Sequence, residues 1–233
     1  MLAKALCAAL LVVVVMAGPA TGVAFADIGY SHGATYTVST TALNPISGWQ
    51  MQIGQISGGN IAVATAFNNA SVASGKTMSA MLDRDRVFRT DATFETTPVV
   101  SFRPTAISQV LTGVYFWRHA AHPLDYVTTV VIDSRTARPI TLDDLFTDHQ
   151  AGLNRLSEQT KLLLPGVWGR AAPMPDEAGN RPIDANFHNW IPTVDGLEIH
   201  YEDYQFGHGL PVITVPWSHL TDLLAPSMQI LAV

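Results

Sequence analysis

The chain has 233 residues and a formal net charge of −6, and its charged side chains are scattered with no run of like sign. This distribution argues against binding of nucleic acid and against docking on anionic lipid, because both need clustered positive charge. The single cysteine, Cys7, allows no disulfide within the chain, so the hydrophobic core must hold the fold together, as it can at this length.

Residues 1–26 have the pattern of a secretory signal peptide. Lys4 supplies a positive charge, residues 10–15 form an apolar run, and Ala24-Phe25-Ala26 is a small-x-small cleavage motif. The apolar run is too short for a spanning helix, which needs about 20 residues. We expect cleavage after Ala26, secretion, and no membrane span in the mature chain; retention of the segment as an N-terminal anchor is the alternative.

The next segment is expected to form two strands and then helix. Residues 35–39 alternate in polarity, Asn44-Pro45 marks a bend, and a second extended piece covers residues 51–56. Asn60 is suited to cap a helix over residues 61–72, where apolar residues recur at helical spacing. A second helix is expected over residues 77–88, because Ser74-Gly75 is typical of a break or kink.

The middle of the chain is rich in strand-forming residues. Three strands are expected over residues 93–102, 108–117 and 126–132, since β-branched and aromatic residues alternate there. The polar residues 133–136 then indicate a turn.

A helical segment follows this turn. Thr141, with Asp144 three positions later, predicts a capping box that opens a short helix over residues 142–146. An amphipathic helix is expected from Asp148 or His149 to Leu164, and Pro165-Gly166 should end it.

The last third begins with a long loop and ends in a hairpin. Residues 165–185 contain four prolines and three glycines, and a loop this long in a compact domain is usually functional or mobile. Strands are expected over residues 197–201 and 212–215, followed by a short helix over residues 219–224 that Ser218 caps. The sequence therefore predicts an α+β domain, with a long helix across an antiparallel β-sheet and an N-terminal strand/helix layer.

Metal-binding residues form only an incomplete pattern. His119 and His122 are the closest histidine pair, and Asp125 lies nearby, which is the beginning of a zinc ligand set. The spacing offers no further ligand and no glutamate base, so these residues are interpreted as polar loop residues. The sequence predicts no metal and no cofactor.

No catalytic signature is complete. A serine hydrolase needs a nucleophile beside an oriented histidine, but the Gly-x-Ser-x-Gly elbow is absent, and Ser101 and Ser108 lie in or beside expected strands. Glu198 and Glu202 share one face with His200, as a glycosidase pair could, yet half-exposed strands show the same alternation. The catalytic residues stay unassigned, and an esterase with a non-standard serine site stays open.

Aromatic residues near strand ends and loops are candidates for contact with a partner or a sugar ring, although such rings are more often core residues. The segment Phe206-Gly207-His208-Gly209 is the best candidate, because its glycines leave the backbone open to close approach. The aromatic set is Trp117, Tyr201, Tyr204, Phe206 and Trp217.

An ordered set of short motifs resembles one family. Residues 97–146 and 186–225 resemble the extracellular domain of the RsiV anti-sigma factors, a domain of otherwise unknown function, and are most similar to the secreted immunogenic (MPT-type) proteins of mycobacteria. The matching motifs are Ala120-Ala121-His122, Ile140-Thr141-Leu142-Asp143-Asp144-Leu145-Phe146, Asn186-Phe187, Thr193-Val194-Asp195-Gly196-Leu197, and the segment Pro216 to Leu224.

The resemblance implies an α+β fold with helix 142–164 on an antiparallel sheet, and secretion or exposure at the cell envelope. RsiV domains bind lysozyme, but this chain lacks the cytoplasmic sigma-binding segment and a later membrane span, so signalling in cis is not expected. The excess of Arg over Lys fits an actinobacterial source. The expected divisions are a signal peptide (1–26), an N-terminal strand/helix part (27–96), an RsiV-like part (97–225) and a tail (226–233).

The leading hypothesis is a secreted, non-catalytic protein that binds a lysozyme-like or host protein or a cell-wall component. A secreted carboxylic-ester hydrolase and a lysozyme-binding module are the alternatives. His122, which matches a family position, joins the candidate binding residues, which are His122, Tyr201, Tyr204, Phe206, His208 and Trp217.

Overall fold

The computed structural model describes residues 27–43, 49–86, 91–170 and 172–233, with the side chains of 83–86 left out. The expected signal peptide, the bend at Asn44-Pro45 and the expected helix end at Phe88 lie outside the described residues. Within the part of the chain that the structure covers, no helix has both the length and the apolar character that a membrane crossing requires.

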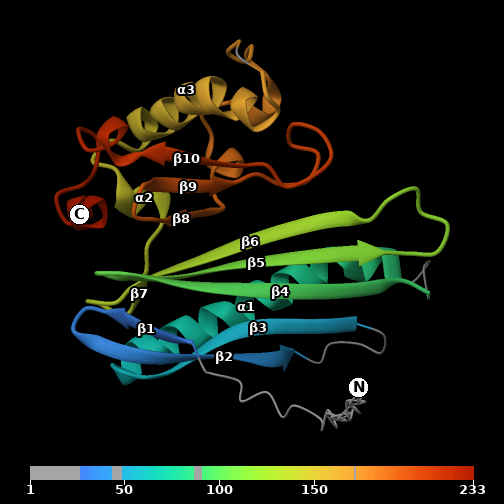
Figure 1. The fold of residues 1–233 in the computed structure, drawn as a ribbon, viewed down its shortest axis with the longest axis horizontal. Coiled ribbons are helices and arrows are strands. Elements are labelled where there is room, and N and C mark those ends of the chain that lie inside the picture. Colours follow the sequence, from blue (N-terminus) through green and yellow to red (C-terminus); the bar gives the residue numbers. More distant parts are fainter. Residues whose placement is uncertain (1–26, 44–48, 87–90, 171) are drawn as a thin grey trace, which may run out of the picture.

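A seven-stranded sheet forms the centre of the molecule, with its strands in sequence order (Figure 1). Its neighbours are antiparallel except for β3 and β4, which pair in parallel through Trp49 with Phe94 and Gln50 with Glu95. This parallel pair departs from the expected antiparallel sheet, and it arises because a helix connects the two strands. The strands are β1 Ile28–Ser31, β2 Ala34–Leu43, β3 Trp49–Gly58, β4 Thr93–Arg103, β5 Ala106–Phe116, β6 Leu124–Asp133 and β7 Arg138–Pro139.

The connecting helix α1, Ile61–Arg86, is continuous, so the prediction of a break at Ser74-Gly75 is wrong. The Ser74 hydroxyl hydrogen-bonds the Thr128 hydroxyl at 2.6 Å. Gly75 packs closely on the sheet, because a Cβ there would lie 2.9 Å from a methyl group of Ile53. Tertiary packing thus outweighs the poor helix propensity of glycine. The expected Asn60 cap is confirmed, with its Oδ1 accepting from the Ala62 amide at 2.9 Å.

A second, three-stranded antiparallel sheet covers the face of β5 and β6 that points away from α1. Helix α3 lies across this small sheet (Figure 1). This arrangement agrees with the expected α+β fold and with a long helix packed on antiparallel strands. The strands are β8 Trp190–Pro192, β9 Gly196–His200 and β10 Val212–Pro216, and the helices are α2 Leu142–Leu145 and α3 His149–Val167.

Local signals around the helices are partly confirmed. The capping box of Thr141 and Asp144 is present, and Asp148 caps α3. Pro165 does not end α3, which continues to Val167, because a proline in the last turn removes one hydrogen bond only. Ser218 caps no helix: a 3-10 turn, η3 Trp217–His219, begins one residue earlier and has no side-chain cap. The other 3-10 turns are η1 Ala178–Asn180, η2 Asp184–Asn186 and η4 Gln229–Ala232.

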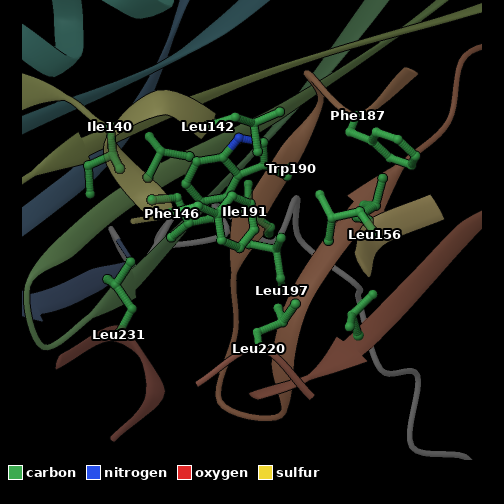
Figure 2. Packing of buried hydrophobic residues seen from close by; sticks show 14 of the residues in the cluster. Ile140, Leu142, Phe146, Leu156, Phe187, Trp190, Ile191, Leu197, Leu220 and Leu231 are labelled. Carbon is green, nitrogen blue, oxygen red and sulfur yellow. The ribbon is translucent and has the colours of Figure 1, made fainter. Parts of the chain in front are cut away.

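Two cores meet at β5. Leu111 packs with residues of α1, whereas its neighbour Val110 belongs to the core between β5, β6 and the small sheet. Trp190 and Leu156 lie in the latter core with Phe146 (Figure 2). Burial on both faces explains why β5 shows no strict alternation of apolar and polar residues. The expected division between residues 96 and 97 lies inside β4.

Candidate functional site at the junction of the sheets

Two loops from different layers meet at one end of the molecule. The connection between β5 and β6 carries His122, and the loop between β9 and β10, residues 201–211, carries Asp203, Tyr204 and His208. Both loops project toward the same side in Figure 1. Together with Asp125 at the start of β6, these residues form what we call the junction cluster: His122, Asp125, Asp203, Tyr204 and His208.

Three rings of the junction cluster lie close together at tilted angles. The ring centroids of His122 and His208 are 4.2 Å apart, and the Tyr204 hydroxyl lies 3.0 Å from Nε2 of His122. Nδ1 of His122 lies 2.8 Å from the carbonyl oxygen of Pro123, which can only accept, so Nδ1 carries a proton. In the neutral ring Nε2 is then an acceptor, and Tyr204 donates to it. All three rings are exposed.

Asp203 holds this arrangement in place. Its Oδ1 accepts from the Gly209 amide at 2.7 Å and from Nδ1 of His208 at 3.0 Å, and its Oδ2 accepts from the Asp125 amide at 3.1 Å. Burial would raise the pKa of the Asp203 carboxyl, but these hydrogen bonds outweigh it and lower the pKa. The carboxylate is therefore ionised at neutral pH, and it ties the loop to β6 while orienting the His208 ring.

The loop backbone depends on its glycines. Gly207 and Gly209 adopt φ of 120° and 110°, which favour glycine, and Tyr204 is itself left-handed at φ 66°. These turns bring the backbone amide of Gly209, which lies five residues after Tyr204, back to the Asp203 carboxylate.

A small apolar pocket of ≈ 190 Å³ opens beside the junction cluster. Met78 and Met81 of α1 form one wall, and Leu124 and Tyr126 of β6 form another. The remaining lining residues are Asp125, Val127, Thr128, Glu202, Asp203 and Tyr204. Flexible methionines adapt to varied ligand shapes. The pocket therefore combines an adaptable apolar wall with a carboxylate-bearing rim.

Glu202 is paired across the rim with a histidine. Nε2 of His188 lies 3.3 Å from Oε1 of Glu202. The hydrogen bond to Glu202 raises the pKa of His188, and the same bond lowers the pKa of Glu202. Glu198, by contrast, pairs with His200 on its own strand at 2.9 Å. The two glutamates of the proposed glycosidase face thus have separate histidine partners.

The predicted binding residues divide into two groups. His122, Tyr204 and His208 come together in the junction cluster, and half-buried Phe206 packs edge-on against Tyr201 at 5.0 Å. Tyr201 is fully buried, and its hydroxyl bonds the Thr160 hydroxyl at 2.6 Å.

Trp217 is also buried, with its indole N–H donating to the Thr193 carbonyl at 3.0 Å. Because Tyr201 and Trp217 lie in the core, neither ring presents a surface to a partner, and their assignment to a binding surface is corrected here.

Sequence reasoning missed the members of the site that the fold supplies from afar. In the sequence Asp203 stands out only as a carboxylate that adjoins Glu202, and Met78 and Met81 have the pattern of ordinary helix residues. Asp125 was noted only as a neighbour of His122. His119, the other half of the histidine pair, is exposed with φ of 69° and lies outside the junction cluster.

The chain matches no protein-family profile and no curated protein by sequence. Its fold is similar to two solved structures of DUF3298 family proteins. One is from Pseudomonas aeruginosa PAO1, with a TM-score of 0.52, 12% identity, and coverage of 84% of this chain and 94% of that chain. The other is from Bacteroides fragilis NCTC 9343, with a TM-score of 0.52, 12% identity, and coverage of 88% and 96%.

The DUF3298 family is related to RsiV-like domains, so the likeness agrees with the expected fold. The finer resemblance to mycobacterial secreted proteins stays a prediction. At this identity the likeness is one of architecture alone: the chain has the fold of DUF3298 proteins, whose function is unknown.

Proposed function

We propose that the protein is a secreted, non-catalytic binding protein that acts at the cell envelope or on a host molecule, with the junction cluster and its pocket as the recognition surface. The observation that carries this proposal is the convergence of His122, Tyr204 and His208, which lie up to 86 positions apart and form one exposed cluster of rings. Recognition residues often sit on loops that a rigid scaffold positions.

The pocket supports the same role. Exposed rings beside an apolar recess offer contact area with little loss of side-chain entropy, which is typical of the centre of a binding surface. The carboxylates of Asp125, Glu202 and Asp203 give the rim a negative character. Within this class of function, a basic protein such as a lysozyme is the favoured partner, because complementary charge steers association.

The experiment is a binding titration of the purified chain against a lysozyme and against soluble cell-wall fragments. We expect saturable binding that weakens about tenfold or more in the double variant His122→Ala/Tyr204→Ala, a change of about 1.4 kcal/mol. The matched control is His119→Ala, an exposed histidine of the same loop outside the junction cluster, and it should bind as the unaltered chain does. Equal affinity of both variants, or no binding to either ligand, would argue against this surface.

The alternative function, a carboxylic-ester hydrolase, is tested with a fluorophosphonate probe and a short-chain nitrophenyl ester. Among the residues that the structure describes, no serine hydroxyl hydrogen-bonds a histidine ring; the hydroxyl of Ser101, for example, bonds that of Ser108 at 2.9 Å. Such a bond orients a serine nucleophile in most hydrolases, and this favours a binding protein. Covalent labelling of one serine, with turnover that its substitution abolishes, would establish the hydrolase instead.

A further inference from the structure

The junction cluster brings together three side chains that bind metal ions in other proteins. One carboxylate oxygen each from Asp125 and Asp203 and one ring nitrogen of His208 all lie within 4.8 Å of one another. Asp125 belongs to β6, and the other two lie in the loop after β9, 78 or more positions later. A ligand set spread over two segments could not be seen as a sequence motif, and the His119/His122 spacing pointed only to its neighbourhood.

Charge favours a cation at this place. Two carboxylates that converge repel each other unless a positive group lies between them. Within the described residues, no lysine or arginine makes an ion pair with Asp125 or Asp203. In this described part of the chain, the ionisable partner of Asp203 is the His208 ring, which lies 3.0 Å away and is itself a metal ligand when neutral.

We propose that Asp125, Asp203 and His208 bind a divalent transition-metal ion of the zinc class, with three protein ligands and an open position for water or a ligand. Carboxylate oxygen and imidazole nitrogen suit zinc, manganese, cobalt and nickel better than an oxygen-only set would. Exposure of the His208 ring leaves the fourth position accessible from solvent.

The geometry requires a small rearrangement of protons and no large movement of the chain. Two ligand atoms at zinc–ligand lengths of about 2.0–2.1 Å lie roughly 3.3 Å apart on a tetrahedral ion, and Oδ1 of Asp203 and Nδ1 of His208 are already 3.0 Å apart. The ion replaces the proton between them. In the neutral ring that proton reappears on Nε2, and in the imidazolium the Nδ1 proton is released to solvent.

The surroundings hold the ligands in the required orientation. Asp203 keeps its bonds from the Gly209 and Asp125 amides, which fix the carboxylate as outer-shell partners do in metal sites. The centroid of the His122 ring lies 4.2 Å from that of the His208 ring, so the His122 ring limits the rotation of His208. Asp203 is thus positioned by the backbone and His208 by its neighbouring ring before any ion arrives.

The test is titration of the full chain, prepared without a histidine tag and treated with chelator, with Zn²⁺ by calorimetry and with Co²⁺ by visible absorption. We expect one Zn²⁺ per chain, and affinity at least tenfold weaker in His208→Gln and in Asp125→Asn. His119→Gln, in the neighbouring loop, serves as the matched control and should bind as the unaltered chain does. Stoichiometric binding that neither ligand variant weakens, or no binding at micromolar Zn²⁺, would overturn the site.

Two further readouts keep the result unambiguous. Circular dichroism and thermal unfolding of the metal-free variants check that each is folded; Asp125→Asn keeps the backbone amide that bonds Asp203. Added Zn²⁺ should raise the unfolding temperature of the unaltered chain but not of His208→Gln, because only a ligand bound to the folded state stabilises it. Metal binding is measured on the chain alone, without a protein partner. Failure to bind Zn²⁺ would therefore leave the partner-binding proposal standing, and failure to bind a partner would leave the metal site standing.

Discussion

Asp203 shows how one side chain can define the shape of a loop. Its carboxylate is 6% exposed and accepts from two backbone amides and one histidine ring. In Asp203→Asn, one of the two carboxylate oxygens becomes an NH2 group. That group then faces a backbone N–H, so two donors meet. We expect a loss of about 1–3 kcal/mol in the free energy of unfolding, measured by urea denaturation. Asp195→Asn, at an exposed position outside the cluster, should change it little.

The pair His188–Glu202 predicts a pH dependence of stability. Because folding raises the pKa of His188, protonation of this ring stabilises the folded state. This stabilisation is fully present below pH 6.5, the ordinary pKa of histidine, and is lost as the pH rises through the pKa of the folded state. The lowered pKa of Glu202 contributes stability that is complete above 4.5 and is lost as the pH falls through its folded-state value. The pair is therefore strongest between these two pH values.

Both side chains are about half exposed, so solvent screening keeps the contribution to about 0.2–1 kcal/mol. Urea unfolding at pH 5.5 and pH 8 should show a larger difference in the unaltered chain than in His188→Gln. The difference should shrink in high salt. An identical pH dependence in the two proteins would show that the pair is not coupled to folding.

At the scale of the elements, replacing two helical glycines by alanine should change the stability of the fold in opposite directions. Gly75→Ala places a methyl group 2.9 Å from side-chain atoms of Ile53 and Leu43, and overpacking of this kind costs about 1–3 kcal/mol, more than the gain in helix propensity. Gly166→Ala in α3 meets nothing within 4 Å, so only the propensity gain of up to about 1 kcal/mol remains. Denaturant midpoints should move down for the first variant and up for the second.

The elements also show which signals a sequence carries. The strands of the central meander and the Thr141 capping box were predictable, because they depend on alternation and on contacts three residues apart. The continuity of α1 through Gly75 was not, since it depends on packing against β3. The parallel pairing of β3 and β4 has no local signature at all.

At the scale of the whole molecule, the small sheet and the large sheet should unfold together. Trp190 is buried in the core that joins β8 to β5 and β6 (Figure 2), so Trp190→Ala should cost about 3–5 kcal/mol. The loss should appear equally in far-ultraviolet circular dichroism and in tryptophan fluorescence, with coincident transitions before and after substitution. Separate transitions would mean that the layers are independent units.

The candidate site belongs to this largest scale, and that explains what the sequence could reveal of it. His122, Tyr204 and His208 are each polar or aromatic loop residues in the sequence, and only the docking of two layers brings His122 to the other two. Tyr201 and Trp217 carried the same signal but point into the core, since a single aromatic residue does not indicate which side of a strand or turn it occupies.

The position of β5 between two cores has an evolutionary consequence. Val110 packs toward the small sheet and Leu111 toward α1, so a volume change at either position is felt in one core, and a backbone shift is felt in both. In a library of all single substitutions selected for folded protein, β5 should tolerate fewer replacements than β2, whose outward side chains face solvent. Sequence drift should therefore accumulate in β2, next to one edge strand of the large sheet, and be least in β5.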